Sequence, residues 1–176
     1  MILQALTELA ETFEARQVRY LVVGGVAVNA HGHARMTRDL DLVIHLEPAN
    51  LERALDALEA LGFRPGTPEP LHAFADPQNR RAWKEARNME AFSLRSDRFP
   101  LVPVDLLVTE PFDFDEAWAA SVRADLDAGI PVRIAGLRTL ISMKEAVGRP
   151  QDLEDARHLR AILGVSEADT GGTHRE

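Results

Sequence analysis

Two aspartates one residue apart, Asp39 and Asp41, place the strongest constraint on how this chain folds. They begin the run DLDLVI at 39–44, whose apolar residues alternate as in a strand with one buried face. Side chains of a strand alternate between its faces, so both carboxylates point to one side, roughly 6.6–6.8 Å apart along the strand. Carboxylates that converge repel each other unless a cation or a shared proton lies between them. Because Mg²⁺ prefers oxygen ligands, the spacing predicts a magnesium site.

The segment before this pair predicts a site for phosphate. Residues 20–23 are an apolar, β-prone run that ends at Gly24 and Gly25. Glycines at the end of a strand permit a tight turn and the close approach of a ligand to backbone N–H groups. Residues 26–30 read as a short helix, whose N-terminus favours phosphate. A phosphate cradle beside paired carboxylates is the combination that phosphoryl or nucleotidyl transfer needs.

These motifs also resemble those of a known superfamily. The motif VGG at 23–25, thirteen further residues and DLDL at 39–42 resemble the signature of nucleotidyltransferases with the DNA polymerase β-like fold. The pattern R-x-T-x-D-x-D that starts at Arg35 resembles the small bacterial nucleotidyltransferases grouped with the AbiEii/AbiGii-type toxins. The resemblance spans about residues 18–160. It implies an α+β fold with a mixed β-sheet flanked by helices and with further helices at the C-terminus.

A third carboxylate, Asp105, stands alone in the apolar run 102–108, which we expect to pair as a hairpin with a strand over 89–94. A buried, unpaired carboxylate is costly, so it needs a partner. On a strand beside the first pair, Asp105 would complete a metal triad and accept a proton from an acceptor hydroxyl. The placement matches the third acidic position of the superfamily. The alternative is that Asp105 caps a turn or pairs with an arginine.

The C-terminal segment carries one more motif. We expect helices that begin at Leu137 and that run over 151–163, separated by a break at 148–150. Lys144 and Asp152 belong to a run that resembles a further motif of the AbiEii-type family. The resemblance implies that Lys144 contacts the triphosphate and that Asp152 orients it. Asp155 shares a helix face with Asp152, and ordinary acidic charge in the first turn of a helix is the alternative explanation for both.

The resemblance implies a Mg²⁺-dependent nucleotidyltransferase that moves an NMP from an NTP to a hydroxyl acceptor and releases pyrophosphate. Two Mg²⁺ ions would be held by the three aspartates, which are also the predicted catalytic residues. Gly24 and Gly25 would hold phosphates through their N–H groups. Arg35 is the phosphate candidate in the following loop, and the Thr37 hydroxyl is positioned for phosphate or metal. Loop histidine His33 and its neighbour His31 are poor Mg²⁺ ligands and would at most stack on a base.

The remaining elements frame this site. We expect a covering helix over 2–16 and another from Pro48 to Gly62. Residues 64–79 lack a clear period and are predicted to be a loop or lid. The segment RRAWKEAR at 80–87 is either a solvated helix face or a cationic edge for triphosphate or nucleic acid. A short helix is expected over 113–121, then two short strands around a turn at Asp127-Ala128-Gly129.

Composition limits the class of protein. The chain of 176 residues is predicted to form one domain over 1–164 with a flexible tail over 165–176. It has no cysteine, no membrane-spanning run and no signal peptide, so we expect a soluble cytoplasmic protein. The net charge of −8 argues against non-specific binding of nucleic acid.

The acceptor is left open among tRNA, another RNA, a protein or a small molecule, and a partner protein or a second copy of the chain would complete its site. The alternative function is a non-catalytic module that binds a nucleotide or a protein, such as one component of a toxin–antitoxin pair. A metal phosphohydrolase is a third candidate, but the water-activating residues that it requires cannot be placed in the sequence.

Overall fold

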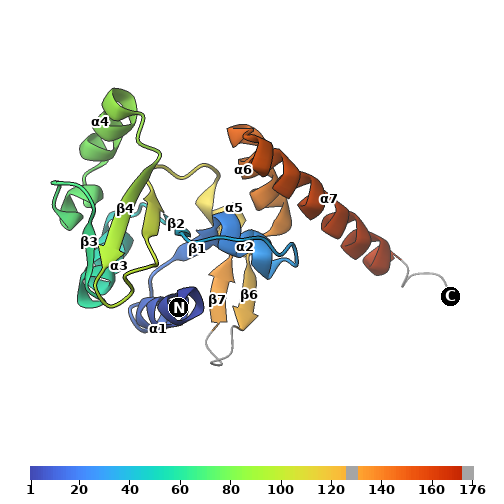
Figure 1. The fold of residues 1–176 in the computed structure, drawn as a ribbon, viewed down its shortest axis with the longest axis horizontal. Helices are drawn as coiled ribbons and strands as arrows, with labels where there is room; N and C mark the ends of the chain where they lie inside the picture. The colour runs from blue at the N-terminus through green and yellow to red at the C-terminus, as the bar shows by residue number, and fades with distance from the viewer. Residues whose placement is uncertain (126–130, 172–176) are drawn as a thin grey trace.

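A mixed sheet of seven strands forms the centre of the described structure (Figure 1). The computed structural model describes residues 1–125 and 131–171. The strands are β1 (Tyr20–Val23), β2 (Leu40–Ile44), β3 (Phe63–Pro65), β4 (Ala91–Ser96), β5 (Val104–Leu107), β6 (Val122–Asp125) and β7 (Pro131–Ile134). Their order across the sheet is β3-β4-β5-β2-β1-β7-β6. β2 pairs in parallel with β5 and β1 with β7, whereas the other neighbours are antiparallel. The prediction of an α+β fold with a mixed sheet is confirmed.

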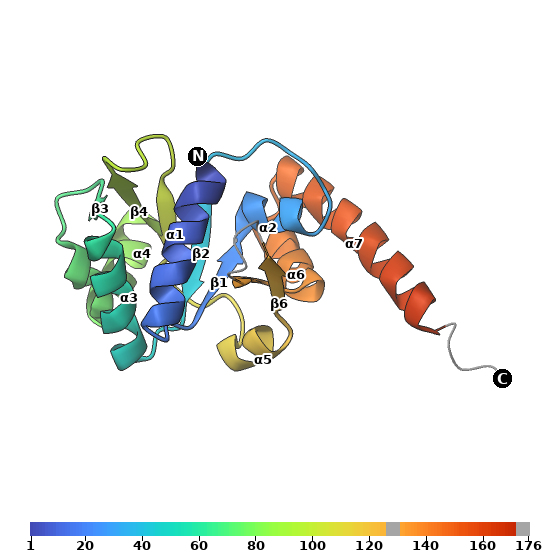
Figure 2. The same ribbon diagram turned by 90° about the horizontal axis from the view of Figure 1, so that it is seen from below.

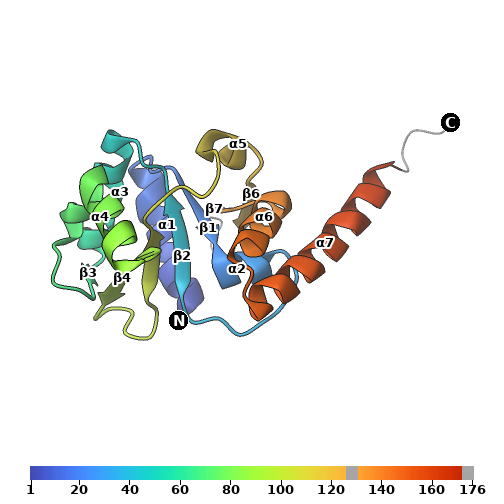
Figure 3. The same cartoon turned by 90° about the horizontal axis from the view of Figure 1, so that it is seen from above.

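Helices cover both faces of this sheet. They are α1 (Ile2–Ala15), α2 (Gly24–Ala30), α3 (Pro48–Ala60), the 3₁₀-helix η1 (Leu71–Ala75), α4 (Pro77–Arg87), α5 (Phe114–Ala119), α6 (Leu137–Val147) and α7 (Pro150–Gly171). Figures 2 and 3 view the molecule from opposite sides, and they place α1 on one side of β1 and β2 and α6 on the other. The C-terminal half of α7 projects away from the rest of the fold (Figure 3).

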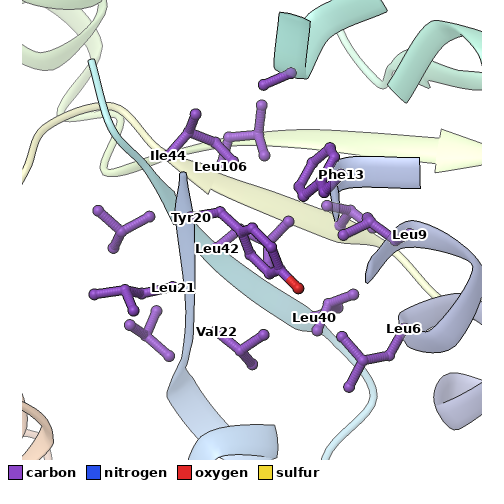
Figure 4. Packing of buried hydrophobic residues seen from close by; sticks show 14 of the residues in the cluster. Leu6, Leu9, Phe13, Tyr20, Leu21, Val22, Leu40, Leu42, Ile44 and Leu106 are labelled. Carbon is purple, nitrogen blue, oxygen red and sulfur yellow. The ribbon is translucent and has the colours of Figure 1, made fainter. Parts of the chain in front are cut away.

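The core lies between the sheet and α1, where strand alternation delivers apolar side chains to one face. Leu40 and Leu42 of β2 are fully buried, and so are Leu9 and Phe13 of α1. These side chains point toward one another in Figure 4. The Phe13 ring also meets the Tyr20 ring edge-on, with centroids 4.8 Å apart. Burial of this face leaves the odd-numbered residues of β2 on the opposite face, where the site forms.

The prediction of a loop over 64–79 is wrong in part. β3 begins at Phe63, η1 covers 71–75 and α4 begins at Pro77. Phe74 is fully buried and stacks on Phe92 of β4, with ring centroids 5.6 Å apart. The apolar side chains of this segment are too few and too irregularly spaced to reveal a helix or strand, and tertiary packing supplies the order.

The basic segment of α4 is mostly committed to internal contacts. Arg80 is 7% exposed and donates to the carbonyl oxygens of Phe74 and Ala75. Its burial lowers the pKa of the guanidinium, opposed by nearby Asp76 and Glu110. Two further cations of α4 form ion pairs: Lys84 pairs with Glu90, and Arg87 pairs with Glu69. Arg80, Lys84 and Arg87 are therefore largely used by the fold itself.

The C-terminal part differs from the prediction in its length. α6 ends at Val147, and α7 continues to Gly171, beyond residue 163 where the sequence predicted its end. The division into a domain over 1–164 and a flexible tail stays a prediction. The strands around 127–129 pair as expected, but the predicted turn itself lies outside the described residues. Within residues 1–125 and 131–171, no helix has the length and apolar character needed to cross a membrane.

The core predicts a large cost for truncating β2. Leu42→Ala should lower the free energy of unfolding by about 2–5 kcal/mol, because the site is fully buried and cannot collapse around a smaller side chain. Leu101→Ala, at a residue that is 70% exposed, should change it by less than about 0.5 kcal/mol. Urea unfolding of the two variants measures the difference, and equal effects would contradict this account of the core.

Candidate active site

Two carboxylates sit side by side at the centre of the sheet. Asp41 of β2 is in register with Asp105 of β5, and the strands run in parallel. Their apolar neighbours Leu42 and Leu106 are buried on the other face. The register therefore sets Asp41 and Asp105 on the same face, one strand apart, roughly 4.7–4.9 Å in the hydrogen-bonding direction.

Asp39 lies at the edge of this pair. β2 begins at Leu40, so the predicted strand over both aspartates starts one residue later than expected. The Leu40 N–H still donates to the Pro103 carbonyl at 3.0 Å, which holds the chain beside β5 up to that point. Asp39 is exposed. It is near enough to Asp41 for its charge to raise the Asp41 pKa.

The Ser93 hydroxyl fixes the third carboxylate. β4 pairs antiparallel with β5, and Ser93 of β4 lies directly opposite Asp105. The Ser93 hydroxyl donates a hydrogen bond to Asp105 Oδ1, with 2.5 Å between the two oxygens. The predicted partner for Asp105 is thus a serine and not an arginine. This bond orients Asp105 toward the open face that it shares with Asp41.

The glycine pair packs directly against the carboxylates. Gly24 begins α2 with φ +64°, and a Cβ there would lie 1.8 Å from Asp41 Oδ2. A Cβ on Gly25 would lie 2.5 Å from Thr37 Oγ1. Only glycine fits at both positions, because the carboxylate and the hydroxyl occupy the space of a side chain. α2 starts at Gly24 itself, two residues before the predicted helix.

The Asp41 carboxyl holds its proton unusually tightly. The pKa of Asp41 is raised from 3.8 to about 6, chiefly by burial and further by the negative charges of Asp105 and Asp39. The positive charge of Lys144 and the Gly25 N–H oppose this rise. The fold therefore holds three carboxylates close together against their mutual repulsion.

The carboxylates do not form a complete metal site by themselves. Among the described residues, no group of three or more acidic or histidine side chains is placed to hold a metal ion. Mg²⁺ does not require one, since it usually takes one or two carboxylates together with phosphate oxygens and water. The raised pKa of Asp41 shows that a positive charge at this place would be favourable. Asp39, Asp41 and Asp105 therefore stay the predicted metal ligands, and the strand register brings Asp41 and Asp105 together.

The loop between α2 and β2 brings two predicted residues to the glycines. Arg35 is held by Asn29 of α2, which exchanges two hydrogen bonds with its backbone at 2.8 and 2.9 Å. A Cβ on Gly25 would lie 3.0 Å from an Arg35 guanidinium nitrogen, so Arg35 and Thr37 both lie over Gly25. The structure thus brings Gly25, Thr37 and Arg35 together beside the carboxylates.

Lys144 lies in a buried ionic cluster with α7. Its Nζ is 2.8 Å from Asp152 Oδ1 and 3.0 Å from Asp155 Oδ2. Asp155 is fully buried and also pairs with Arg35, whose Nε is 3.2 Å from Asp155 Oδ1. The cluster therefore joins the loop, α6 and α7 next to the carboxylates.

The loop histidines have structural partners. His31 Nε2 lies 2.8 Å from the Ala135 carbonyl oxygen. His33 stacks on His158 of α7, with ring centroids 3.9 Å apart and planes 10° apart, and lies 3.8 Å from Asp155. Both rings therefore tie the loop to neighbouring elements.

Sequence reasoning missed two residues of this region, Ser93 and Asn29. The resemblance implied that Asp152 and Asp155 hold the site together, and the structure adds that Asp155 pairs with both Arg35 and Lys144. Ser93 and Asn29 gave no signal, because single polar residues in a strand or short helix are common. For Asp155, its spacing in the motif with Lys144 was the available signal.

The architecture matches solved structures of nucleotidyltransferases. The protein ANT(2″)-Ia, solved in complex with adenylyl-2″-tobramycin, aligns with a TM-score of 0.59 at 17% identity over 96% of this chain and 92% of that one. The chain has the polymerase β-like nucleotidyltransferase fold. The lincosamide antibiotic adenylyltransferase LnuA, solved with lincomycin, aligns at 0.54 and 14% identity over 90% and 96%.

A third solved structure, an antigenic nucleotidyltransferase-like protein from Paracoccidioides brasiliensis, aligns at a TM-score of 0.55 and 17% identity over 93% of this chain and 76% of that one. No protein-family model matches the chain, and neither does any curated protein. At these identities the comparison fixes the nucleotidyltransferase fold, and the predicted AbiEii-type subgroup stays a prediction.

The raised pKa of Asp41 predicts a specific pH dependence of stability. The folded protein binds this proton more tightly than the unfolded chain, so ionisation costs stability as the pH rises from about 4 to about 6. Asp41→Asn removes this cost. Its free energy of unfolding, relative to wild type, should rise by at most about 3 kcal/mol between pH 4 and pH 7 in metal-free buffer. Urea unfolding across this range measures it, and a pH-independent difference would contradict it.

The ionic cluster predicts a second stability effect. Asp155→Asn should lower the free energy of unfolding by about 3 kcal/mol, because it leaves Arg35 and Lys144 with less compensation for their buried charge. Glu154→Gln is the matched control, since Glu154 is the exposed preceding residue of α7. If both variants unfold at the same urea concentration, the cluster does not stabilise the fold.

Proposed function

We propose that this protein is a Mg²⁺-dependent nucleotidyltransferase that transfers an NMP from an NTP to a hydroxyl acceptor with release of pyrophosphate. The observation that carries the proposal is the register of Asp41 with Asp105, next to Asp39, on the open face of the sheet. A fold that concentrates three carboxylates at the cost of a raised Asp41 pKa needs a cation to balance them. A nucleotide triphosphate with its metal supplies that balance.

ATP is the donor that we propose. ANT(2″)-Ia and LnuA, which share the fold, are described with an adenylylated product and as an adenylyltransferase, respectively. Their acceptors are antibiotics, and those acceptors are not transferred to this chain. The proposed reaction forms a bond between the acceptor oxygen and the α-phosphorus and breaks the bond from the α-phosphorus to the bridging oxygen of the departing pyrophosphate.

The residues of the site divide into two groups in this proposal. Asp39, Asp41 and Asp105 hold the metal, and Asp105, oriented by Ser93, accepts the proton of the attacking hydroxyl. When bound, Mg²⁺ would neutralise charge on the phosphates and position the reacting oxygens, and two ions are the expected number.

The second group binds the phosphates. Arg35 and Thr37 lie over Gly25 on the side of the site opposite to Asp105, and they contact the triphosphate. The missing side chain of Gly24 makes room for the Asp41 carboxylate, and the Gly25 N–H is directed at Asp41. Binding of phosphate by the Gly24 and Gly25 N–H groups stays a prediction. Lys144 contributes positive charge from the adjacent cluster.

The role that we propose for Lys144 differs from the direct contact with the triphosphate that the sequence predicted. The Lys144 side chain is 11% exposed, and its ammonium already pairs with Asp152 and Asp155. We propose that Asp152 orients it, as predicted, and that it acts on the leaving pyrophosphate through its field and not as a free, solvent-exposed cation.

The proposal predicts that Asp105→Asn reduces transfer by about 10²–10⁴-fold, the usual range for the loss of a general base. The measurement uses ATP labelled on the α-phosphate, Mg²⁺ and a cell extract as the source of acceptor. Asp56→Asn, at an exposed carboxylate of α3, is the control and should retain activity. If Asp105→Asn transfers as much label as the wild-type protein, Asp105 has no catalytic role.

A non-catalytic nucleotide-binding module gives a different pattern. Such a module would show a Mg²⁺·ATP-induced rise in melting temperature without transfer of label to any molecule of the extract. The enzyme shows both, and Asp41→Asn should abolish the Mg²⁺-dependent part of the thermal shift. Absence of any thermal shift in the wild-type protein would overturn both nucleotide functions.

A further inference from the structure

The open face of the sheet continues beyond the carboxylates toward β3. Ser93 and Arg95 lie two residues apart on β4, so their side chains leave the same face as Asp105. Arg64 of β3 is in register with Arg95. Across the sheet the side chains on this face therefore change from acidic on β2 and β5, through the Ser93 hydroxyl, to two guanidinium groups on β4 and β3.

Arg95 is an available cation on this face. It is exposed and forms neither an ion pair nor a hydrogen bond with any residue in the described part of the chain. Its Nε would lie 3.7 Å from a Cβ at Gly66, so the missing side chain of Gly66 leaves the guanidinium uncovered. Arg64, in contrast, pairs with Asp97, and both of those side chains are largely exposed.

Arg95 is also close enough to serve a substrate held at Asp105. Ser93 is directly opposite Asp105 in the antiparallel pair, and so Arg95 is its diagonal neighbour. Diagonal neighbours lie roughly 7–8 Å apart, within reach of a long side chain. In the proposed reaction the acceptor hydroxyl meets Asp105, while the triphosphate lies on the other side, beside Gly25 and Arg35.

We propose that the acceptor carries a phosphate group and that Arg95 binds it. This inference rests on the proposed function and names the class of its second substrate. A guanidinium presents two parallel N–H groups that match a phosphate, and it stays charged at every physiological pH. A cationic acceptor would gain nothing from contact with Arg95.

The basic segment of α4 is a weaker candidate for this role. It contributes to a cavity of about 330 Å³ lined by Arg80, Arg81, Lys84 and Glu110, among others. That cavity lies beyond the C-terminal ends of β2 and β5, next to Leu46 and Val108, whereas Asp105 is near the start of β5. The cavity is therefore displaced along β5 from Asp105, whereas Arg95 is the diagonal neighbour of Asp105 on the adjacent strand.

The test measures binding of two phosphate-bearing probes to the full chain. The first is a fluorescent, single-stranded oligoribonucleotide with a free 3′-hydroxyl, and the second is a nucleoside 5′-monophosphate used as a competitor. Arg95→Gln should weaken binding of the oligoribonucleotide about tenfold and reduce the dependence of log K on log salt by about one. Arg81→Gln, an exposed arginine of α4, is the matched control and should leave both unchanged.

The two probes distinguish the sources of the phosphate. Displacement of the oligoribonucleotide by equal concentrations of the monophosphate would support a small phosphorylated acceptor. If the oligoribonucleotide stays bound in the presence of the monophosphate, the result would support the end of a nucleic acid as the acceptor. If wild-type protein binds neither probe, or if Arg95→Gln and Arg81→Gln weaken binding equally, the assignment is overturned.

The Mg²⁺·ATP thermal shift separates this inference from the proposed function. Arg95→Gln should keep the full shift, because Arg95 serves the acceptor and not the donor. Loss of the shift in this variant alone would overturn the assignment, since the arginine would then bind ATP. Loss of the shift in the wild-type protein would instead refute nucleotide binding, whatever the two probes do.

Discussion

The structure depends on holding like charges together. Asp41 and Asp105 lie in register on adjacent strands, and the buried leucines on the opposite face prevent the strands from sliding or separating to relieve the repulsion. Burial and neighbouring charge raise the pKa of Asp41 to about 6. The apolar core thus supplies the free energy that keeps an unfavourable group of carboxylates ready for a cation.

A second group of charges surrounds this one and is balanced internally. Lys144 and Arg35 pair with Asp155, which has no exposed surface. Because Lys144 also lowers the pKa of Asp41, the cluster acts on the carboxylates electrostatically. The arrangement connects α6, α7 and the loop before β2, so that the same bonds that stabilise the C-terminal helices also set the field at the site.

Particular residues show where sequence reasoning reached its limit. The alternation of the DLDLVI run predicted a strand with one buried face. β2 confirms the strand, although Val43 on the face of Asp41 is buried as well. The segment 64–79 carried no period, and its order comes from Phe74 packing on Phe92, a contact between residues distant in sequence. The charges at 80–87 formed a plausible binding edge in the sequence, yet Arg80 is buried and bonded to backbone carbonyls.

The sequence by itself predicted the strand that carries Asp41 and the tight glycine turn before it, since periodicity and residue chemistry are local properties, and the resemblance to nucleotidyltransferases implied the mixed α+β architecture. Only the tertiary structure decided that Asp105 faces Asp41, that Ser93 orients it and that Asp155 joins Arg35 to Lys144. Strand order and helix docking depend on which buried faces pack together. A sequence pattern shows that a face is buried, but it does not show which other element packs against that face.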